Sequence, residues 1–215
     1  RKDEDGNALG VFSSGELHWH SNESSEITFS PEVALLGGQH MTGSTTGFVQ
    51  SVDAYNNFSE SFRSELDEMV VIHNYIPGGI NDIELTDKEM GNMLQMEFCY
   101  HPDAEVPLVL TSPGGHKGLH YTTNTATGIK GMSQTESDKI FKIIDNQVFT
   151  DKYIYDHKYK TDNELLLFDN SVTLHRRKDP GHPDRVAYRI QYDPSNLLDS
   201  PWYPFDHLPE YAEKY

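Results

Sequence analysis

The chain has 215 residues, enough for one domain with a substantial core, and it carries a formal net charge of −17. Such an excess of negative charge repels phosphate backbones and argues against a nucleic-acid partner. No apolar run approaches the roughly 18 residues that span a bilayer, which argues against a membrane protein. The single cysteine, Cys99, excludes an internal disulfide and any multi-cysteine metal site, and it fits a reducing, cytoplasmic setting. We therefore expect residues 1–215 to form a single globular domain.

Short apolar runs bounded by Gly, Ser or Pro indicate strands, and apolar residues spaced three or four apart indicate helices. In chain order, these patterns predict strands over 33–37 and 45–50, a helix over about 52–72, strands over 106–111 and 118–123, a helix after a capping box at Ser133 to Glu136, and strands over 153–159, 164–168 and 185–192. A weaker capping signal at Thr86 indicates a shorter helix. Many short strands with few helices predict a mainly β (α+β) fold, with the helices packed outside a sandwich or barrel.

Two stretches far apart in the chain carry candidate metal-binding residues. The first contains His20 and Asn22, and the second contains His175, followed by Arg185 and Arg189. An early His-x-acid pair, a late histidine and an arginine about ten residues beyond it form the pattern of a non-haem iron(II) oxygenase site, in which two imidazoles and a carboxylate hold iron on one face. Here the acid position is occupied by an asparagine.

The residues around these positions resemble the taurine dioxygenase (TauD/TfdA) family. The resemblance rests on Trp19-His20-Ser21-Asn22, Gly43-Ser44-Thr45-Thr46, Ile129-Lys130-Gly131-Met132-Ser133 and Asp169-Asn170-Ser171-Val172-Thr173-Leu174-His175-Arg176, whose order and spacing match from about residue 15 to residue 193. It implies a double-stranded β-helix (jelly-roll) of the clavaminate synthase-like or cupin type that binds Fe(II), 2-oxoglutarate and O₂. The expected reaction couples decarboxylation of 2-oxoglutarate to hydroxylation of an unactivated C–H bond in a small substrate.

The same resemblance implies a role for each matching residue. His20 and His175 would be the imidazole ligands of the metal, with Asn22 at the third position. Thr46 and Arg185 would hold the cosubstrate, and Arg189 would meet an anionic group of the substrate. Independently, a planar guanidinium holds a carboxylate with two parallel hydrogen bonds, and strand alternation places Arg185 and Arg189 on one face.

The asparagine leaves several interpretations open. Asn22 could ligate through its amide oxygen, or the neighbouring Glu23 could take its place if a turn redirects that side chain. A halide could fill the position, as in related iron halogenases, or the site could be weak or inactive. A non-catalytic jelly-roll binding protein is the alternative from a different functional class.

Three further histidines are weaker candidates. His18 would share a strand face with His20, although lining a cavity or facing solvent is the simpler role. His116 and His120 lie in a Gly-rich turn that, by analogy with the family, lines the substrate side. Because only nineteen residues precede His20, we expect part of the family's usual N-terminal segment to be missing, and neither the substrate nor the oligomeric state follows from the sequence.

Overall fold

A computed structural model describes residues 17–24, 30–73, 104–123 and 125–192 of the chain. Most of the regular structure in these residues is strand, with few helices, as predicted. The helix predicted at Thr86 and the residue Cys99 lie outside the described residues.

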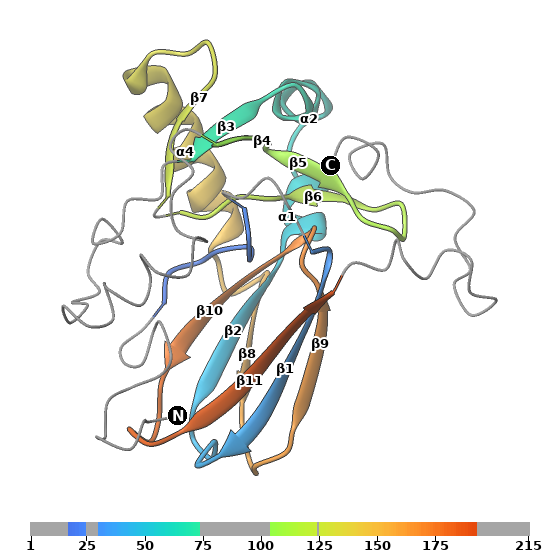
Figure 1. Ribbon diagram of the computed structural model, residues 1–215. Coiled ribbons are helices and arrows are strands. Elements are labelled where there is room, and N and C mark those ends of the chain that lie inside the picture. Colours follow the sequence, from blue (N-terminus) through green and yellow to red (C-terminus); the bar gives the residue numbers. More distant parts are fainter. Residues whose placement is uncertain (1–16, 25–29, 74–103, 124, 193–215) are drawn as a thin grey trace.

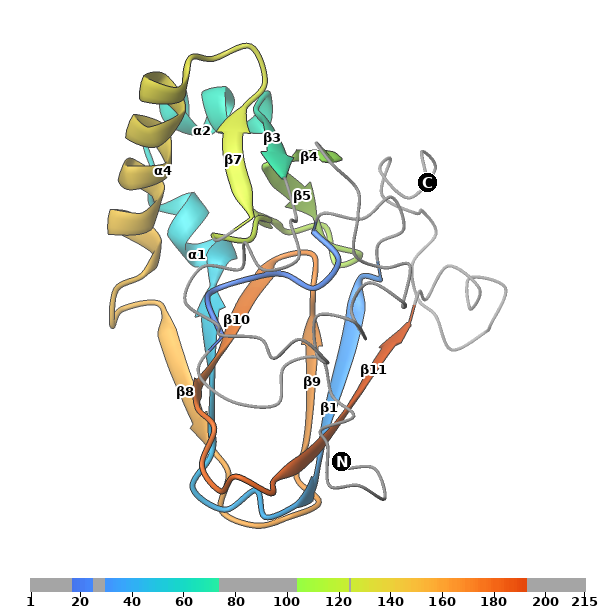
Figure 2. The ribbon, with the colours of Figure 1, turned by 60° about the vertical axis from the view of Figure 1, so that its left-hand side comes forward.

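Two antiparallel three-stranded sheets face each other (Figures 1 and 2). The first contains β1 (Glu32–Gln39), β9 (Leu165–Asp169) and β11 (Val186–Tyr192), in the order β11-β1-β9. The second contains β2 (Thr45–Gln50), β8 (Ile154–Lys158) and β10 (Thr173–Asp179), in the order β10-β2-β8. Strands from the two ends of the chain are therefore neighbours in both sheets, which brings the two candidate stretches into one region.

The first sheet has two dissimilar faces. Val33 is fully buried on the face toward the second sheet, while several large apolar side chains on the opposite face are exposed to solvent. On that outer face Leu165, Leu167, Tyr188 and Ile190 are between 51% and 64% exposed. The buried and exposed residues fall on opposite faces because successive side chains of a strand point in opposite directions.

The remaining elements lie beyond one end of these two sheets (Figure 1). A third sheet contains β3 (Val70–His73), β4 (Ala104–Pro107) and β7 (Ala126–Ile129), in the order β4-β3-β7, and β5 (Val109–Thr111) pairs with β6 (Lys117–Leu119). The described helices are α1 (Ser51–Asn56), α2 (Glu60–Asp67) and α4 (Gln134–Val148). None of these helices is long and apolar enough to cross a membrane.

The prediction of one helix over about 52–72 was wrong. The chain forms α1, a break, α2 and then β3. Ser59 adopts an extended conformation at the break, and its hydroxyl accepts a hydrogen bond from the Phe62 amide, so α2 starts with its own N-cap. Beyond α2, the β-branched run Val70-Val71-Ile72 pairs with strands on both sides. Phe58 and Phe62 pack edge to face across the break, with ring centroids 5.2 Å apart, so the apolar residues on its two sides remain in contact.

Two predicted strands were also too long. The run 106–111 is divided at Leu108 between β4 and β5, which belong to different sheets, and the run 118–123 ends as a strand at Leu119. The capping box was correct. The Ser133 hydroxyl accepts from the Glu136 amide and the Glu136 carboxylate accepts from the Ser133 amide, and α4 begins at Gln134.

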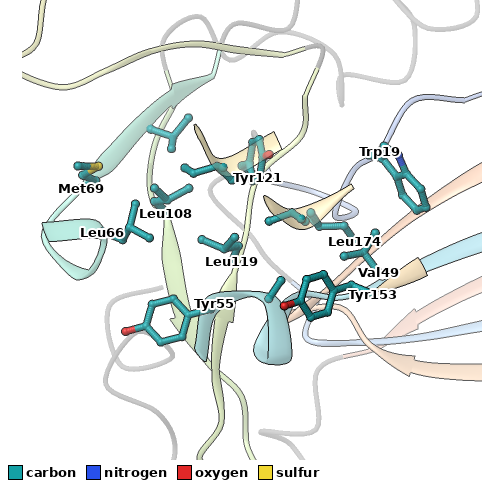
Figure 3. Close-up of a cluster of buried hydrophobic side chains, with 14 of the residues drawn as sticks. Trp19, Val49, Tyr55, Leu66, Met69, Leu108, Leu119, Tyr121, Tyr153 and Leu174 are labelled. Carbon is teal, nitrogen blue, oxygen red and sulfur yellow. The ribbon is translucent and has the colours of Figure 1, made fainter. Parts of the chain in front are cut away.

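Where the helices meet the two main sheets, a hydrophobic core forms (Figure 3). It contains Leu66, Leu108, Leu119, Ile144, Val148 and Leu174, all with no exposed surface. Trp19 joins this core by stacking on Phe149, with ring centroids 5.3 Å apart, and the guanidinium of Arg176 lies 4.3 Å from the Trp19 ring. The segment that carries His20 is therefore fixed to the core by the residue that precedes it.

A carboxyl pair at the end of the first sheet gives a pH-dependent prediction. Glu32 lies opposite Asp169, and burial, with a smaller contribution from the Asp169 charge, raises the pKa of Glu32 from 4.5 to about 7. Above pH 4.5 the unfolded chain releases this proton before the folded chain does, so folding stability falls between pH 4.5 and 7 and the full cost remains above pH 7.

We expect Glu32→Gln to stabilise the protein at pH 8 by about 1 kcal/mol, after allowance for solvent screening, which raises the unfolding temperature by roughly 2–4 °C. At pH 4 the substitution should have little effect. Thermal unfolding followed by circular dichroism at both pH values measures this, with Glu65→Gln on an exposed face of α2 as the control. An equal shift at both pH values would contradict the assignment.

Candidate metal and cosubstrate site

The structure brings His20 and His175 together. Each residue's amide donates to the other's carbonyl, at 2.9 Å from His20 and 2.8 Å from His175, so the two form an antiparallel bridge. Their imidazole centroids are 4.1 Å apart and the rings are inclined at 47°. Figure 2 shows the segment that contains His20 crossing the end of the two sheets nearer the helices, beside β10. Two rings in this arrangement can share one ion.

The hydrogen bonding of His20 is suited to metal binding. Its Nδ1 lies 2.7 Å from the carbonyl oxygen of His18, and because a carbonyl only accepts, Nδ1 carries the proton. In the neutral ring, Nε2 then holds the lone pair, and a backbone carbonyl that fixes the tautomer in this way is typical of metal-binding histidines. Burial, together with the Arg189 charge, lowers the pKa of His20 to about 4. The ring is therefore neutral at physiological pH, as a ligand must be.

His175 is enclosed by apolar rings. It is 5% exposed, and the rings of Phe168 and Phe48 lie with centroids 4.7 Å and 6.4 Å from its own. Burial, then the neighbouring His20 and Arg189, lower the pKa of His175 well below its ordinary value. Its buried Nδ1 has no hydrogen-bond partner among the described residues. A buried imidazole whose nitrogen lacks a hydrogen-bond partner, next to a second neutral imidazole, is a suitable pair of ligands for a metal ion.

Asn22 does not present a free oxygen at the third position. It is 4% exposed, and its Oδ1 accepts a hydrogen bond of 3.1 Å from Nη1 of Arg189. The other end of the amide, Nδ2, is buried and has no partner among the described residues. An amide nitrogen donates and has no lone pair for a cation. In agreement, the described residues contain no group of three His, Cys, Asp or Glu side chains that could hold a metal.

Glu23 is directed elsewhere. It has a positive φ of 60°, and its carboxylate accepts a hydrogen bond of 2.7 Å from the Ser30 amide. The turn that was required to redirect this side chain is therefore present, but in the structure the carboxylate closes the loop to Ser30.

Asn170 holds the backbone of Asn22 in place. Its Oδ1 accepts from the Asn22 amide at 2.8 Å, while its Nδ2 donates to the Asn22 carbonyl at 2.9 Å and to the Ser30 carbonyl at 3.0 Å. Asn170 is completely buried and lies just after β9. His120, which is also buried, hydrogen-bonds to the backbone of Asn170 and Ser171. This pair of side chains fixes the position of residue 22 relative to the strand that bears His175.

Thr46 and Arg185 both interact with Tyr159. The Thr46 side chain is hydrogen-bonded to the buried hydroxyl of Tyr159, and the charge of Arg185 acts on the same hydroxyl. Thr46 pairs across the sheet with Arg177, whose pKa is lowered to about 10 by burial and by the charge of Arg185. Thr46, Tyr159, Arg177 and Arg185 thus form one cationic, hydroxyl-containing cluster.

Some of these residues were missed from the sequence. Asn170 stood inside the quoted Asp169–Arg176 motif without a role, and its importance comes from contacts 148 residues away. Arg177 could have been found, because strand alternation places it on the same face as His175. Of the weaker candidates, His18 accepts a hydrogen bond from His20 through its backbone carbonyl, and His120 hydrogen-bonds to the backbone of Asn170. His116 is exposed in the turn between β5 and β6.

The family model described as taurine catabolism dioxygenase TauD, TfdA family, matches residues 1–191. The chain belongs to the TauD/TfdA family. A comparison with curated protein sequences gave no significant match. Membership confirms the resemblance recognised in the sequence and the double-stranded β-helix (jelly-roll) fold, of which the two facing sheets are the core.

Solved structures agree with this fold. AAD-2 in complex with Mn(II) and N-oxalylglycine is 25% identical, with a TM-score of 0.64 over 81% of this chain and 66% of that one. A putative alpha-ketoglutarate dependent 2,4-D dioxygenase from Burkholderia xenovorans is 19% identical, with a TM-score of 0.66 over 89% and 72%. A taurine dioxygenase from the same organism is 18% identical, with a TM-score of 0.63 over 86% and 58%. The chain thus spans just under two thirds of the length of AAD-2.

Proposed function

We propose that this chain is a Fe(II)- and 2-oxoglutarate-dependent oxygenase that hydroxylates an unactivated C–H bond of a small substrate. The observation that carries the proposal is the pairing of two neutral imidazoles, His20 and His175, beside a set of arginines in a TauD/TfdA jelly-roll. In the overall reaction, 2-oxoglutarate, O₂ and the substrate R–H give succinate, CO₂ and R–OH.

Each part of the site has a separate task. His20 and His175 would hold the metal, and Phe48 and Phe168 exclude water from the His175 side. Bound iron(II) would supply the activation of O₂ that no side chain can perform. Thr46 and Arg185 would orient 2-oxoglutarate by its distal carboxylate. The complex of AAD-2 with N-oxalylglycine supports a ligand of this class, because that compound is also a 2-oxo diacid-like molecule with two carboxylates.

Arg189 supports an anionic substrate. Its guanidinium is held beside the metal ligands by Asn22, and a guanidinium pairs well with sulfonate or carboxylate groups. Taurine and 2,4-D, which appear in the names of two structural relatives, both carry such a group. A substrate screen would therefore begin with small sulfonates and carboxylates.

One observation favours a second candidate, a 2-oxoglutarate-dependent halogenase. The buried Nδ2 of Asn22, with no partner among the described residues, could donate to an anion at the third metal position, and Arg189 would add attraction. Product mass spectrometry with chloride present and absent separates the two reactions. A product that gains chlorine only in chloride buffer would favour halogenation, and a product that gains only oxygen in both would favour hydroxylation.

The main test measures metal retention and succinate formation. We expect the purified chain to bind Mn(II) anaerobically in isothermal titration calorimetry and, with Fe(II), to convert 2-oxoglutarate to succinate. His175→Ala should reduce metal affinity by at least about 100-fold, because loss of a direct ligand should exceed the 10–100-fold cost of losing an outer partner. His116→Ala, an exposed histidine, is the matched control. A wild-type chain that retains no metal and forms no succinate with any substrate would instead be a non-catalytic jelly-roll binding protein.

A further inference from the structure

We propose that Thr122 is a positioning residue of the metal site, and that its hydroxyl fixes the peptide that joins Ser21 to Asn22. This peptide lies one residue after the proposed ligand His20. The inference rests on the proposed function and adds a residue to which the family resemblance gives no role. It follows from the hydrogen bonds that hold the two edges of the segment 19–22.

The backbone of the segment 19–22 is held from two sides. On one side, His20 exchanges amide and carbonyl hydrogen bonds with His175 on β10. On the other side, the Trp19 carbonyl accepts from the Thr123 amide at 3.0 Å and from the Thr123 hydroxyl at 3.1 Å. The segment therefore lies between β10 and the stretch of chain that follows β6, like a strand with a neighbour along each edge.

Thr122 holds the next carbonyl along this second edge. Its hydroxyl donates to the Ser21 carbonyl at 3.2 Å, and both residues are buried. In a regular sheet the carbonyls along a strand edge accept from main-chain N–H groups of the neighbouring strand, whereas here a side chain is the donor. The Ser21 carbonyl belongs to the peptide that joins Ser21 to Asn22, so the Thr122 hydroxyl determines how that peptide is oriented.

The same hydroxyl takes part in a second hydrogen bond, with the buried hydroxyl of Ser24. A hydroxyl has one proton, and Thr122 directs its proton to the Ser21 carbonyl, so Ser24 is the donor in this pair. The hydrogen bonds therefore run from Ser24 to Thr122 and on to Ser21, and they enclose the turn that contains Asn22. Loss of the Thr122 hydroxyl would remove both bonds at once.

The main chain of Thr122 is tied to the third sheet. Its carbonyl accepts from the Thr125 amide at 3.2 Å and from the Ala126 amide at 3.0 Å, and Ala126 begins β7. The Thr125 hydroxyl is bonded at 2.8 Å to Nδ1 of His73, which is completely buried at the end of β3. The Thr122 side chain thus projects from a turn that is fixed to two strands, and a positioning side chain requires a rigid support of this kind.

Metal binding and thermal unfolding, measured on the same preparation, test the proposal. Thr122→Val keeps the branched shape of the side chain and removes the hydroxyl. We expect it to weaken Mn(II) binding in anaerobic calorimetry by roughly 10-fold or more, as for other groups that orient metal ligands. The two lost hydrogen bonds should also lower the unfolding temperature by roughly 4–8 °C. Thr122→Ser retains the hydroxyl and should bind Mn(II) nearly as tightly as wild type.

Two further variants control for the loss of a hydroxyl elsewhere. Thr127→Val removes an exposed hydroxyl on β7 that donates to the Ile72 carbonyl at 3.1 Å, and it should change neither quantity appreciably. Tyr55→Phe removes a hydroxyl on α1 that donates to the Asp67 carboxylate at 2.6 Å. It should lower the unfolding temperature without weakening Mn(II) binding, which shows what a purely structural loss does.

The outcomes separate this inference from the proposed function. A wild-type chain that binds no Mn(II) would overturn the proposed function. If wild type binds Mn(II) and Thr122→Val binds it equally tightly, or Thr122→Ser does not regain the affinity, the role of Thr122 alone is overturned. Should Thr122→Val fail to fold because its methyl group meets the Ser24 hydroxyl, Thr122→Ala takes its place, since it lacks the hydroxyl without filling the space. The same comparison with Thr122→Ser then decides.

Discussion

Asn22→Asp is expected to increase the affinity for iron(II) by at least about 100-fold, because a direct charged ligand should matter more than the outer partners whose loss costs 10–100-fold. The reason lies in the two ends of the Asn22 side chain. Oδ1 already accepts from Arg189, while the buried Nδ2 has no partner among the described residues. In aspartate the second atom becomes an oxygen with lone pairs for a cation, and the bond to Arg189 becomes charge-assisted.

Anaerobic Mn(II) titration measures this effect, and succinate formation with Fe(II) should rise in parallel. Asn22→Ala is the control, because it removes the amide without supplying a charge and should not improve metal binding. If Asn22→Asp and wild type bind Mn(II) equally, the amide already serves as a ligand and the third position is placed differently from the structure. The same comparison in chloride buffer tests the halogenase alternative, in which the aspartate should exclude halide.

Asn170→Ala is expected to affect both stability and metal binding. The side chain makes three hydrogen bonds, two buried ones to the Asn22 backbone and a partly buried one to the Ser30 carbonyl. At about 1 kcal/mol for each bond, the loss is about 3 kcal/mol, which lowers the unfolding temperature by roughly 6–12 °C. Because residue 22 is then no longer fixed beside His20, Mn(II) affinity should fall by roughly 10–100-fold, as for other partners that orient metal ligands.

Calorimetry for Mn(II) and thermal unfolding are measured on the same preparation. Asn146→Ala, on an exposed position of α4, is the control for loss of an asparagine and should change neither quantity appreciably. A variant that loses stability yet binds Mn(II) as tightly as wild type would show that Asn170 supports the fold without positioning the site.

Much of the fold could be predicted because local patterns and tertiary contacts agree. The capping box at Ser133 is a local signal, and α4 begins where it indicates. The continuous helix over 52–72 failed because Ser59 starts a new helix and Val70–His73 finds partner strands on both sides. The spacing of apolar residues alone does not reveal an N-cap that starts a new helix within an apolar stripe. Nor does it reveal a strand that is stabilised by partners distant in the sequence.

The candidate site follows the same division. His20, His175, Thr46 and Arg185 were indicated by the resemblance of the surrounding motifs to the TauD/TfdA family. The hydrogen bond from Arg189 to Asn22 could not be predicted, because it joins residues 167 positions apart and depends on how two strands are placed. Asn170 is similar, since an asparagine next to a strand usually indicates only a turn.

The mutual backbone bridge between His20 and His175 has a consequence for how a metal enters the protein. The two proposed ligands are far apart in the sequence and become neighbours only in the folded chain, where His20 bridges to His175 on β10. A metal that both imidazoles hold would therefore bind the native state and stabilise it by mass action. In contrast to small zinc domains, which need their ion in order to fold, chelator-treated protein should remain native and should regain its melting-temperature shift when divalent metal is added back.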